Sequence, residues 1–71
     1  MQISETKPRT WLKEIREGKG LSMKTVARDS DIAECYYSQI ENGIRNASVK
    51  VAKRIAEALE FSWQKFFEDE N

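Results

Sequence analysis

Few side chains in this 71-residue chain could do chemistry, and their types exclude most catalytic arrangements. The chain has no His, so a Ser–His nucleophile pair is impossible. The single cysteine, Cys35, cannot form an internal disulfide or supply a zinc cage alone. Asp29 and Asp31 could act as paired carboxylates, but without a pocket they are better explained as solvated turn residues. We therefore expect no enzyme, no metal site and no cofactor.

Positive charge is the other chemical feature, and it is concentrated in one segment. The formal net charge is zero, which argues mildly against nucleic-acid binding. However, residues 1–54 carry 11 basic and 7 acidic side chains, whereas residues 55–71 carry 1 basic and 5 acidic. The segment 44–54 holds four basic residues and no acidic one: Arg45, Lys50, Lys53 and Arg54. Such a segment could follow a DNA phosphate strand, although a solvated helix face would have the same composition.

Five short helices must position these residues. Apolar spacing and punctuating residues predict helices near 8–17, 22–30, 33–42 and 48–59, with a brief fifth after Ser62. No alternation typical of strands is present, so we expect an all-α fold, a compact five-helix bundle. The length allows one domain, ordered over about residues 8–67, with an acidic tail at 68–71 that is expected to fray.

Local signals mark the helix starts. Pro8 suits the first turn of a helix, because its missing N–H would have no partner there. Ser22 is the expected N-cap of the second helix, and Leu21 and Val26 flank it with the spacing of a hydrophobic staple. Ser48 opens the fourth helix, which has the most regular apolar stripe in the chain.

The helices near 22–30 and 33–42 have the features of a helix-turn-helix over about residues 22–42. Five residues would form the inner face of the pair: Val26, Ala27, Ile32, Tyr37 and Ile40. Ala27 is small enough to let two helices cross closely. Asp31 stands in the turn, where positive φ is required, and Asp tolerates this conformation. The second helix of such a pair projects from the body and fits a DNA major groove.

The chain resembles the Cro and phage-repressor family of helix-turn-helix regulators, also called the xenobiotic-response-element (XRE) family. The resemblance lies in the runs LKEIREGKGLSMKTVA and YYSQIENGIRNASVKVAKRIAEALEFSWQKFF, and most specifically in SQIENG followed by RN. It implies a lambda-repressor-like DNA-binding domain. The implied function is a sequence-specific transcriptional regulator, a repressor of phage or mobile-element type that binds a palindromic operator as a homodimer.

The resemblance also implies roles for single residues. The positions that face base edges in the recognition helix are Glu34, Cys35, Ser38 and Gln39. The implied phosphate contacts are Lys24, at the start of the second helix, and Asn42, Arg45 and Asn46, in the loop after the recognition helix. We add Lys50 and Tyr36 to the phosphate set, although Tyr36 is equally compatible with packing.

The chemistry of the base-facing residues suggests preferences. Gln39 can pair in a bidentate way with adenine, and Ser38 can either donate or accept. Glu34 can only accept, which favours the amino group of cytosine. Cys35 has a small apolar body suited to a thymine methyl group, and we expect this role in preference to redox chemistry.

The C-terminal aromatic residues predict a contact with another chain. Trp63 is expected in the core, whereas Phe66 and Phe67 are candidates for a dimer interface. The alternative function is a protein-interaction module, antitoxin-like or adaptor-like, that keeps the fold with a weakened DNA surface.

Membrane and export signals are not found in the sequence. No apolar run approaches the roughly 20 residues that a membrane helix needs. The N-terminal MQISETKPRT lacks the apolar stretch of a signal peptide. We therefore expect a cytoplasmic protein with no membrane partner, whose partners are double-stranded DNA and a second copy of the chain.

Overall fold

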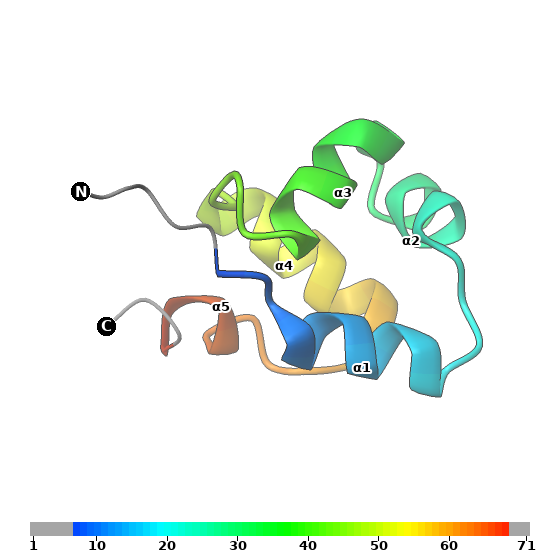
Figure 1. The fold of residues 1–71 in the computed structure, drawn as a ribbon, viewed down its shortest axis with the longest axis horizontal. Helices are drawn as coiled ribbons and strands as arrows, with labels where there is room; N and C mark the ends of the chain where they lie inside the picture. The colour runs from blue at the N-terminus through cyan, green and yellow to red at the C-terminus, as the bar shows by residue number, and fades with distance from the viewer. Residues whose placement is uncertain (1–6, 69–71) are drawn as a thin grey trace.

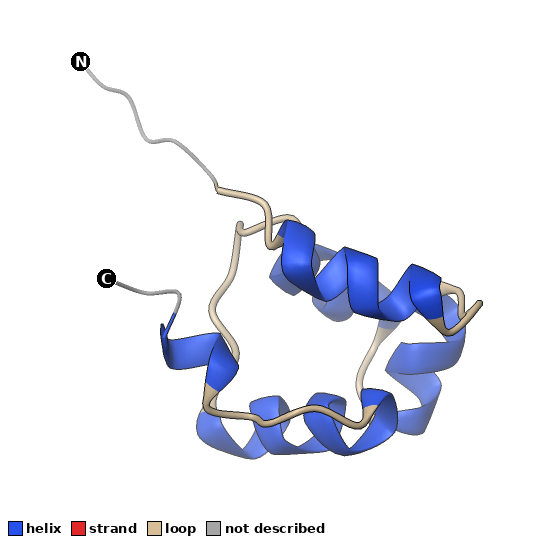
Figure 2. Cartoon of the chain, turned by 90° about the horizontal axis from the view of Figure 1, so that it is seen from below, coloured by secondary structure: helices blue, strands red, loops and turns tan. Residues whose placement is uncertain are grey.

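The computed structural model describes residues 7–68 and contains five helices joined by short loops (Figure 1). They are α1 (Thr10–Gly18), α2 (Met23–Asp29), α3 (Glu34–Glu41), α4 (Val49–Leu59) and α5 (Lys65–Glu68). No strand occurs among the described residues, which are drawn only as helix and loop in Figure 2. The all-α, five-helix fold is therefore confirmed. None of the helices in this part of the chain is long and apolar enough to cross a membrane.

The helix-turn-helix begins and turns where the sequence indicates. The Ser22 hydroxyl accepts a hydrogen bond from the Thr25 N–H at 3.1 Å, which caps α2. Ser48 caps α4 in the same way, accepting from the Val51 N–H at 3.2 Å. Asp31, between α2 and α3, has φ 62°, as predicted for this turn. These local signals confirm the predicted starts of α2 and α4.

The prediction that Pro8 lies in the first turn of α1 is wrong, because α1 begins at Thr10. Arg9 has φ −83° and ψ 78°, which is not helical. Its backbone N–H donates to the carbonyl oxygen of Glu41 at 2.8 Å, so a contact with the end of α3 holds this residue out of the helix. A tertiary contact therefore overrides the local signal.

The core lies between the helices and contains four of the five residues predicted to face inward from the helix-turn-helix, whereas the fifth, Ile32, is only partly buried against it. Leu12 of α1, Val26 and Ala27 of α2, and Tyr37 and Ile40 of α3 are buried, and α4 adds Ala52, Ile55 and Leu59. Since α2 packs against both α3 and α4, it joins the helix-turn-helix to the rest of the bundle.

A charged network is buried beside this apolar core. Arg16 of α1 donates from Nε and Nη2 to the two carboxylate oxygens of Glu41, at 2.8 and 3.0 Å. The Tyr37 hydroxyl donates to Glu41 Oε1 at 2.8 Å, and Arg16 Nη1 donates to the Leu21 carbonyl at 2.8 Å. Arg16 and Glu41 are 7% and 3% exposed. Because all these groups find partners, the network ties α1 to the back of α3.

The surroundings of Arg16 and Tyr37 in this network raise the pKa of both side chains. The hydrogen bond to Glu41 raises the pKa of the Arg16 guanidinium above its usual value. Burial raises the pKa of the Tyr37 hydroxyl well above its ordinary range, and the hydrogen bond to Glu41 adds to this shift. Both groups therefore keep their protons throughout the physiological range of pH.

The C-terminal aromatic residues do not behave as predicted. Phe66 is 1% exposed and packs edge-on against Trp11, with ring centroids 5.2 Å apart, so its assignment to a dimer interface is wrong. Trp63, predicted in the core, is only partly buried. Phe67 is 38% exposed and stays a candidate. The short α5 can turn only one side inward, so neighbouring residues have different environments.

Of the acidic tail, Glu68 ends α5, and residues 69–71 lie outside the described residues.

Candidate nucleic-acid interface

Helix α3 has one buried face and one accessible face. Tyr37, Ile40 and Glu41 are buried. On the other side Glu34 and Cys35 are exposed, and Ser38 and Gln39 are half-buried. This division follows from the helical repeat, since residues three and four apart share a face. All four predicted base-facing residues therefore lie outside the core, and their contact with bases stays a prediction.

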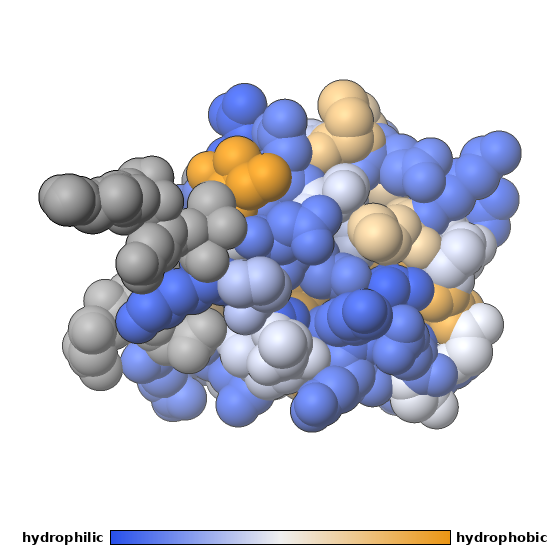
Figure 3. All heavy atoms as spheres, viewed as in Figure 1, coloured by the Kyte–Doolittle hydropathy of each residue, from blue (hydrophilic) through white to orange (hydrophobic). Residues whose placement is uncertain are grey.

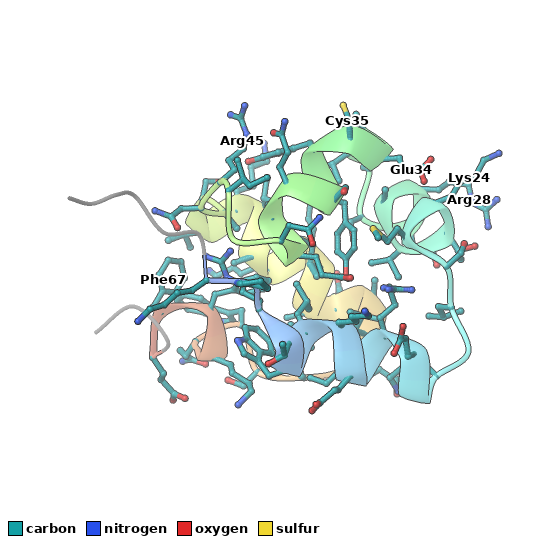
Figure 4. The ribbon with its side chains drawn as sticks, in the orientation of Figure 1. Lys24, Arg28, Glu34, Cys35, Arg45 and Phe67 are labelled. Atoms are coloured by element: carbon teal, nitrogen blue, oxygen red, sulfur yellow. The ribbon has the colours of Figure 1, made fainter. Side chains whose placement is uncertain are left out.

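Several side chains predicted to contact DNA project from the same edge of the molecule. Figure 4 shows Lys24 of α2, Glu34 and Cys35 of α3, and Arg45 of the following loop pointing away from the core along that edge. Arg28, one turn after Lys24, is also exposed there. Sequence reasoning missed Arg28, although its i, i+4 spacing from Lys24 could have indicated it.

The loop between α3 and α4 is held from behind by Arg9. This buried guanidinium donates from Nη1 to the carbonyl oxygens of Ile40 at 2.6 Å and Arg45 at 3.3 Å. Its Nη2 donates to Asn46 Oδ1 at 3.1 Å. Because the Asn46 oxygen faces Arg9, its amide N–H groups stay free to donate elsewhere, as a phosphate contact would need. No periodicity could have revealed Arg9, which acts on residues more than 30 positions away.

Gly43 permits the turn that leads into this loop. It has φ 78°, a conformation that side chains with a Cβ rarely adopt. A Cβ at this position would overlap the carbonyl group of Lys7, with the carbonyl carbon at 2.6 Å. The segment that precedes α1 and the loop that follows α3 are therefore packed backbone to backbone.

Two hydrogen bonds connect predicted DNA-contacting residues to each other. Arg45 Nε donates to Gln39 Oε1 at 2.8 Å, and Asn42 Nδ2 donates to Ser38 Oγ at 3.3 Å. The Arg45 guanidinium also lies over the ring of Tyr36, 5.4 Å from its centroid. Tyr36 is half-buried, so it both packs against Arg45 and keeps part of its surface accessible.

The basic residues of α4 have different surroundings. Lys50 is exposed in the first turn of α4. Lys53 Nζ instead lies 5.0 Å from the centroid of the Trp63 ring, and Arg54 Nη1 lies 3.8 Å from Asp31 Oδ2. Successive residues of a helix point in different directions, so these basic side chains have different neighbours. Their contact with one phosphate strand beside Arg45 stays a prediction.

The rest of the accessible surface is mainly polar. Figure 3 shows a largely hydrophilic face with scattered apolar residues. Within residues 7–68, the large hydrophobic residues exposed by more than a third are Ile44, Val49 and Phe67. Figure 4 shows Phe67, a residue of α5, on another part of the surface from Glu34 and Cys35. Among residues 7–68, no three side chains of the types that bind metals come together as a metal site requires.

Comparison with known proteins gives a consistent set of relatives. The helix-turn-helix family HTH_3 matches residues 12–66. The chain is 49% identical over 61 residues to the uncharacterized HTH-type transcriptional regulator YqaF of Bacillus subtilis strain 168, spanning 86% of this chain and 80% of that protein. It is 37% identical over 59 residues to the control protein C.MunI of a Mycoplasma species, spanning 82% and 80% of the two chains.

A solved structure shows the same arrangement of helices. The restriction-modification controller protein C.AhdI from Aeromonas hydrophila superposes with a TM-score of 0.72 at 36% sequence identity. The superposition covers 79% of this chain and 85% of that one. The similarity therefore includes most of both chains and is not confined to the two helices of the motif.

Proposed function

The chain belongs to the helix-turn-helix family HTH_3, a family of DNA-binding transcriptional regulators of the XRE type and not of enzymes, and we propose that it is a repressor. It binds a palindromic operator as a homodimer, in the cytoplasm and in the manner of the small repressors of phages and mobile elements. The observation that carries this proposal is the division of α3 into a buried face and an accessible polar face.

In this mechanism α3 enters the major groove. Its accessible side chains, Glu34, Cys35, Ser38 and Gln39, lie on the face that would meet base edges. The buried network around Glu41 supports this placement, because it fixes α3 against α1 before DNA binds. A helix already held in position loses little conformational entropy on binding. Repression is then steric, since occupancy of the operator excludes other proteins.

The phosphate contacts flank the recognition helix. Lys24 lies at the start of α2, and the loop between α3 and α4 brings Asn42, Arg45 and Asn46 together, with Tyr36 and Lys50 at its borders. Arg9 supports this loop through the carbonyl groups it binds, so the phosphate-contacting groups are arranged in advance. These contacts supply affinity and orientation, whereas the base contacts supply sequence selectivity.

The dimer is proposed to form through the α5 end of the molecule, with Phe67 at the contact. Phe67 is exposed and its ring meets Trp63 edge-on, with centroids 5.8 Å apart. Burial of this pair against a second copy would remove apolar surface from water. A two-fold axis then places the two α3 helices about 34 Å apart, one turn of DNA.

The relatives favour a second candidate within the same mechanism. C.AhdI is described as a restriction-modification controller protein and C.MunI as a control protein. By analogy, this chain would control genes of a restriction–modification system, and control could include activation. A transcription assay with the region upstream of its own gene separates the two candidates. A repressor lowers transcription at every protein concentration, whereas an activating controller raises it over some range.

The DNA-binding proposal is tested by titrating fluorescent genomic fragments, including the region upstream of the gene, at two salt concentrations. We expect one fragment to be selected, with an affinity that falls steeply with salt because bound phosphates release counterions. Weak binding to all fragments that does not depend on salt would contradict the proposal and favour the protein-interaction module.

The dimer is tested separately by sedimentation with and without operator DNA. We expect two protein chains on each operator, and Phe67→Ser should weaken this assembly. A monomer at high protein concentration under both conditions would contradict the dimer and leave the DNA-binding face unaffected.

A further inference from the structure

Arg45 and Gln39 form a pair whose hydrogen-bond direction is fixed by chemistry. Arg45 Nε lies 2.8 Å from the Gln39 side-chain amide, at Oε1. A guanidinium has only N–H donors, so the amide atom that faces it has to be the carbonyl oxygen. The NH₂ group of Gln39 is therefore the part of the amide left for other partners.

The pair is held from several sides. The backbone N–H groups of Ile44 and Arg45 both donate to the backbone carbonyl oxygen of Gln39, at 2.9 and 3.2 Å. The Tyr36 ring lies against the Arg45 guanidinium, with 5.4 Å from its carbon to the ring centroid. Arg9 binds the Arg45 carbonyl oxygen from within the fold at 3.3 Å. The loop thus returns Arg45 to Gln39, two residues before the end of α3.

We propose that Arg45 is a specificity-determining residue, which makes Gln39 a donor and so directs it to guanine. A free glutamine can donate and accept at once, and this matches adenine, which offers N7 as an acceptor and N6–H₂ as a donor. With Oε1 engaged, Gln39 offers only N–H groups, and Arg45 has further N–H groups beside it. Guanine presents two acceptors, N7 and O6, and fits this pair of donors.

The inference rests on the proposed function and refines the adenine preference predicted for an unpaired glutamine. It also gives Arg45 a role beyond phosphate contact. A phosphate contact lowers affinity for all sequences equally when it is removed, whereas a residue that orients a base reader changes which base is preferred.

The test begins with selection of preferred duplexes from a random pool by the full chain. The base pair that Gln39 reads is the position whose preference disappears in Gln39→Ala. Duplexes that differ only at that position are then titrated with the wild-type chain and with Arg45→Met, which keeps the bulk of the side chain and removes its donors. Lys50→Met is the matched control, because it removes one exposed cation without contacting Gln39.

We expect the wild type to prefer guanine over adenine there, and Arg45→Met to change the guanine-to-adenine affinity ratio by about tenfold towards adenine. Lys50→Met should weaken all duplexes by the same factor. Adenine preference in the wild type, or an unchanged ratio in Arg45→Met, would overturn the inference while leaving the repressor proposal intact. Failure of the wild type to select any sequence is a different result, which overturns the proposed function itself.

Discussion

The two faces of α3 are held in place in different ways. On the inner face, Tyr37 and Glu41 join Arg16 in a network whose members are all buried. On the outer face, the bonds from Arg45 to Gln39 and from Asn42 to Ser38 are exposed to water. One helix of eight residues therefore combines a buried support with an outer face whose hydrogen bonds are open to solvent.

The difference separates stability from recognition. A buried charge that loses its partner cannot find water, so breaking the inner network is costly. When a substitution removes an exposed hydrogen bond, water replaces the lost partner, so the protein loses little stability. Substitutions on the outer face should therefore change binding with little effect on folding, and substitutions on the inner face should do the reverse.

The largest effect is expected for Arg16→Met, which leaves Glu41 buried without its cation. The free energy of unfolding should fall by about 3–5 kcal/mol, measured by urea denaturation. Lys19→Met is the control, because it breaks the exposed pair with Glu60 at 3.2 Å and should cost no more than about 1 kcal/mol. Equal losses in the two variants would show that burial does not distinguish the inner network.

If Arg16→Met does not fold, the double variant Arg16→Met, Glu41→Leu keeps the test possible. Removal of both charges takes away the unpaired carboxylate, so much of the lost stability should return. A double variant as unstable as the single one would mean that Arg16 contributes through packing and not through its pairing with Glu41.

Gly43→Ala changes the turn that directly follows α3, so it should affect both stability and DNA binding. The added Cβ would have positive φ and would overlap the Lys7 carbonyl, so stability should fall by about 1–3 kcal/mol. DNA affinity should fall as well, because the loop between α3 and α4, which we propose contacts phosphates, would have to move. The melting temperature and a DNA titration measure the two effects. Gly18→Ala is the control, since a Cβ there meets nothing within 4 Å.

Gln39→Ala tests the outer face. We expect a loss of operator affinity of about 1–3 kcal/mol and a relaxed preference at one base pair. The free energy of unfolding should change by no more than about 0.5 kcal/mol, because the side chain is only half-buried. A large loss of stability with unchanged base preference would mean that the outer face serves folding and not recognition.

The smallest expected effect is a pH dependence of the stability, caused by Tyr37 on the inner face of α3. The pKa of Tyr37 is raised in the folded state, so its contribution to stability is complete below about pH 10, where the unfolded tyrosine begins to ionise. Above that pH the unfolded state loses a proton that the folded state keeps, and stability should fall by about 1 kcal/mol between pH 10 and 11. Tyr37→Phe should remove this component of the pH dependence, whereas the control Tyr36→Phe should keep it.

Much of the fold could be predicted from the sequence because the signals are local. The caps at Ser22 and Ser48, the positive φ of Asp31 and the inward stripe of α4 depend on residues within a few positions of each other. The location of the candidate site on the helix-turn-helix followed from the same patterns. Periodicity alone did not distinguish Phe66, which is buried, from Phe67, which is exposed.

By itself, the sequence determined that the chain is helical, which faces of its helices are apolar and where its helix-turn-helix lies. The tertiary structure alone decided the burial of Arg9 and Arg16, the pairing of Arg45 with Gln39 and the contacts of Lys53 with Trp63 and of Arg54 with Asp31. The physical reason is that a charged side chain is buried only where other parts of the fold supply its hydrogen-bond and ion-pair partners. For Arg9 and Arg16 these partners lie up to 37 positions away in the chain, and folding alone brings them together.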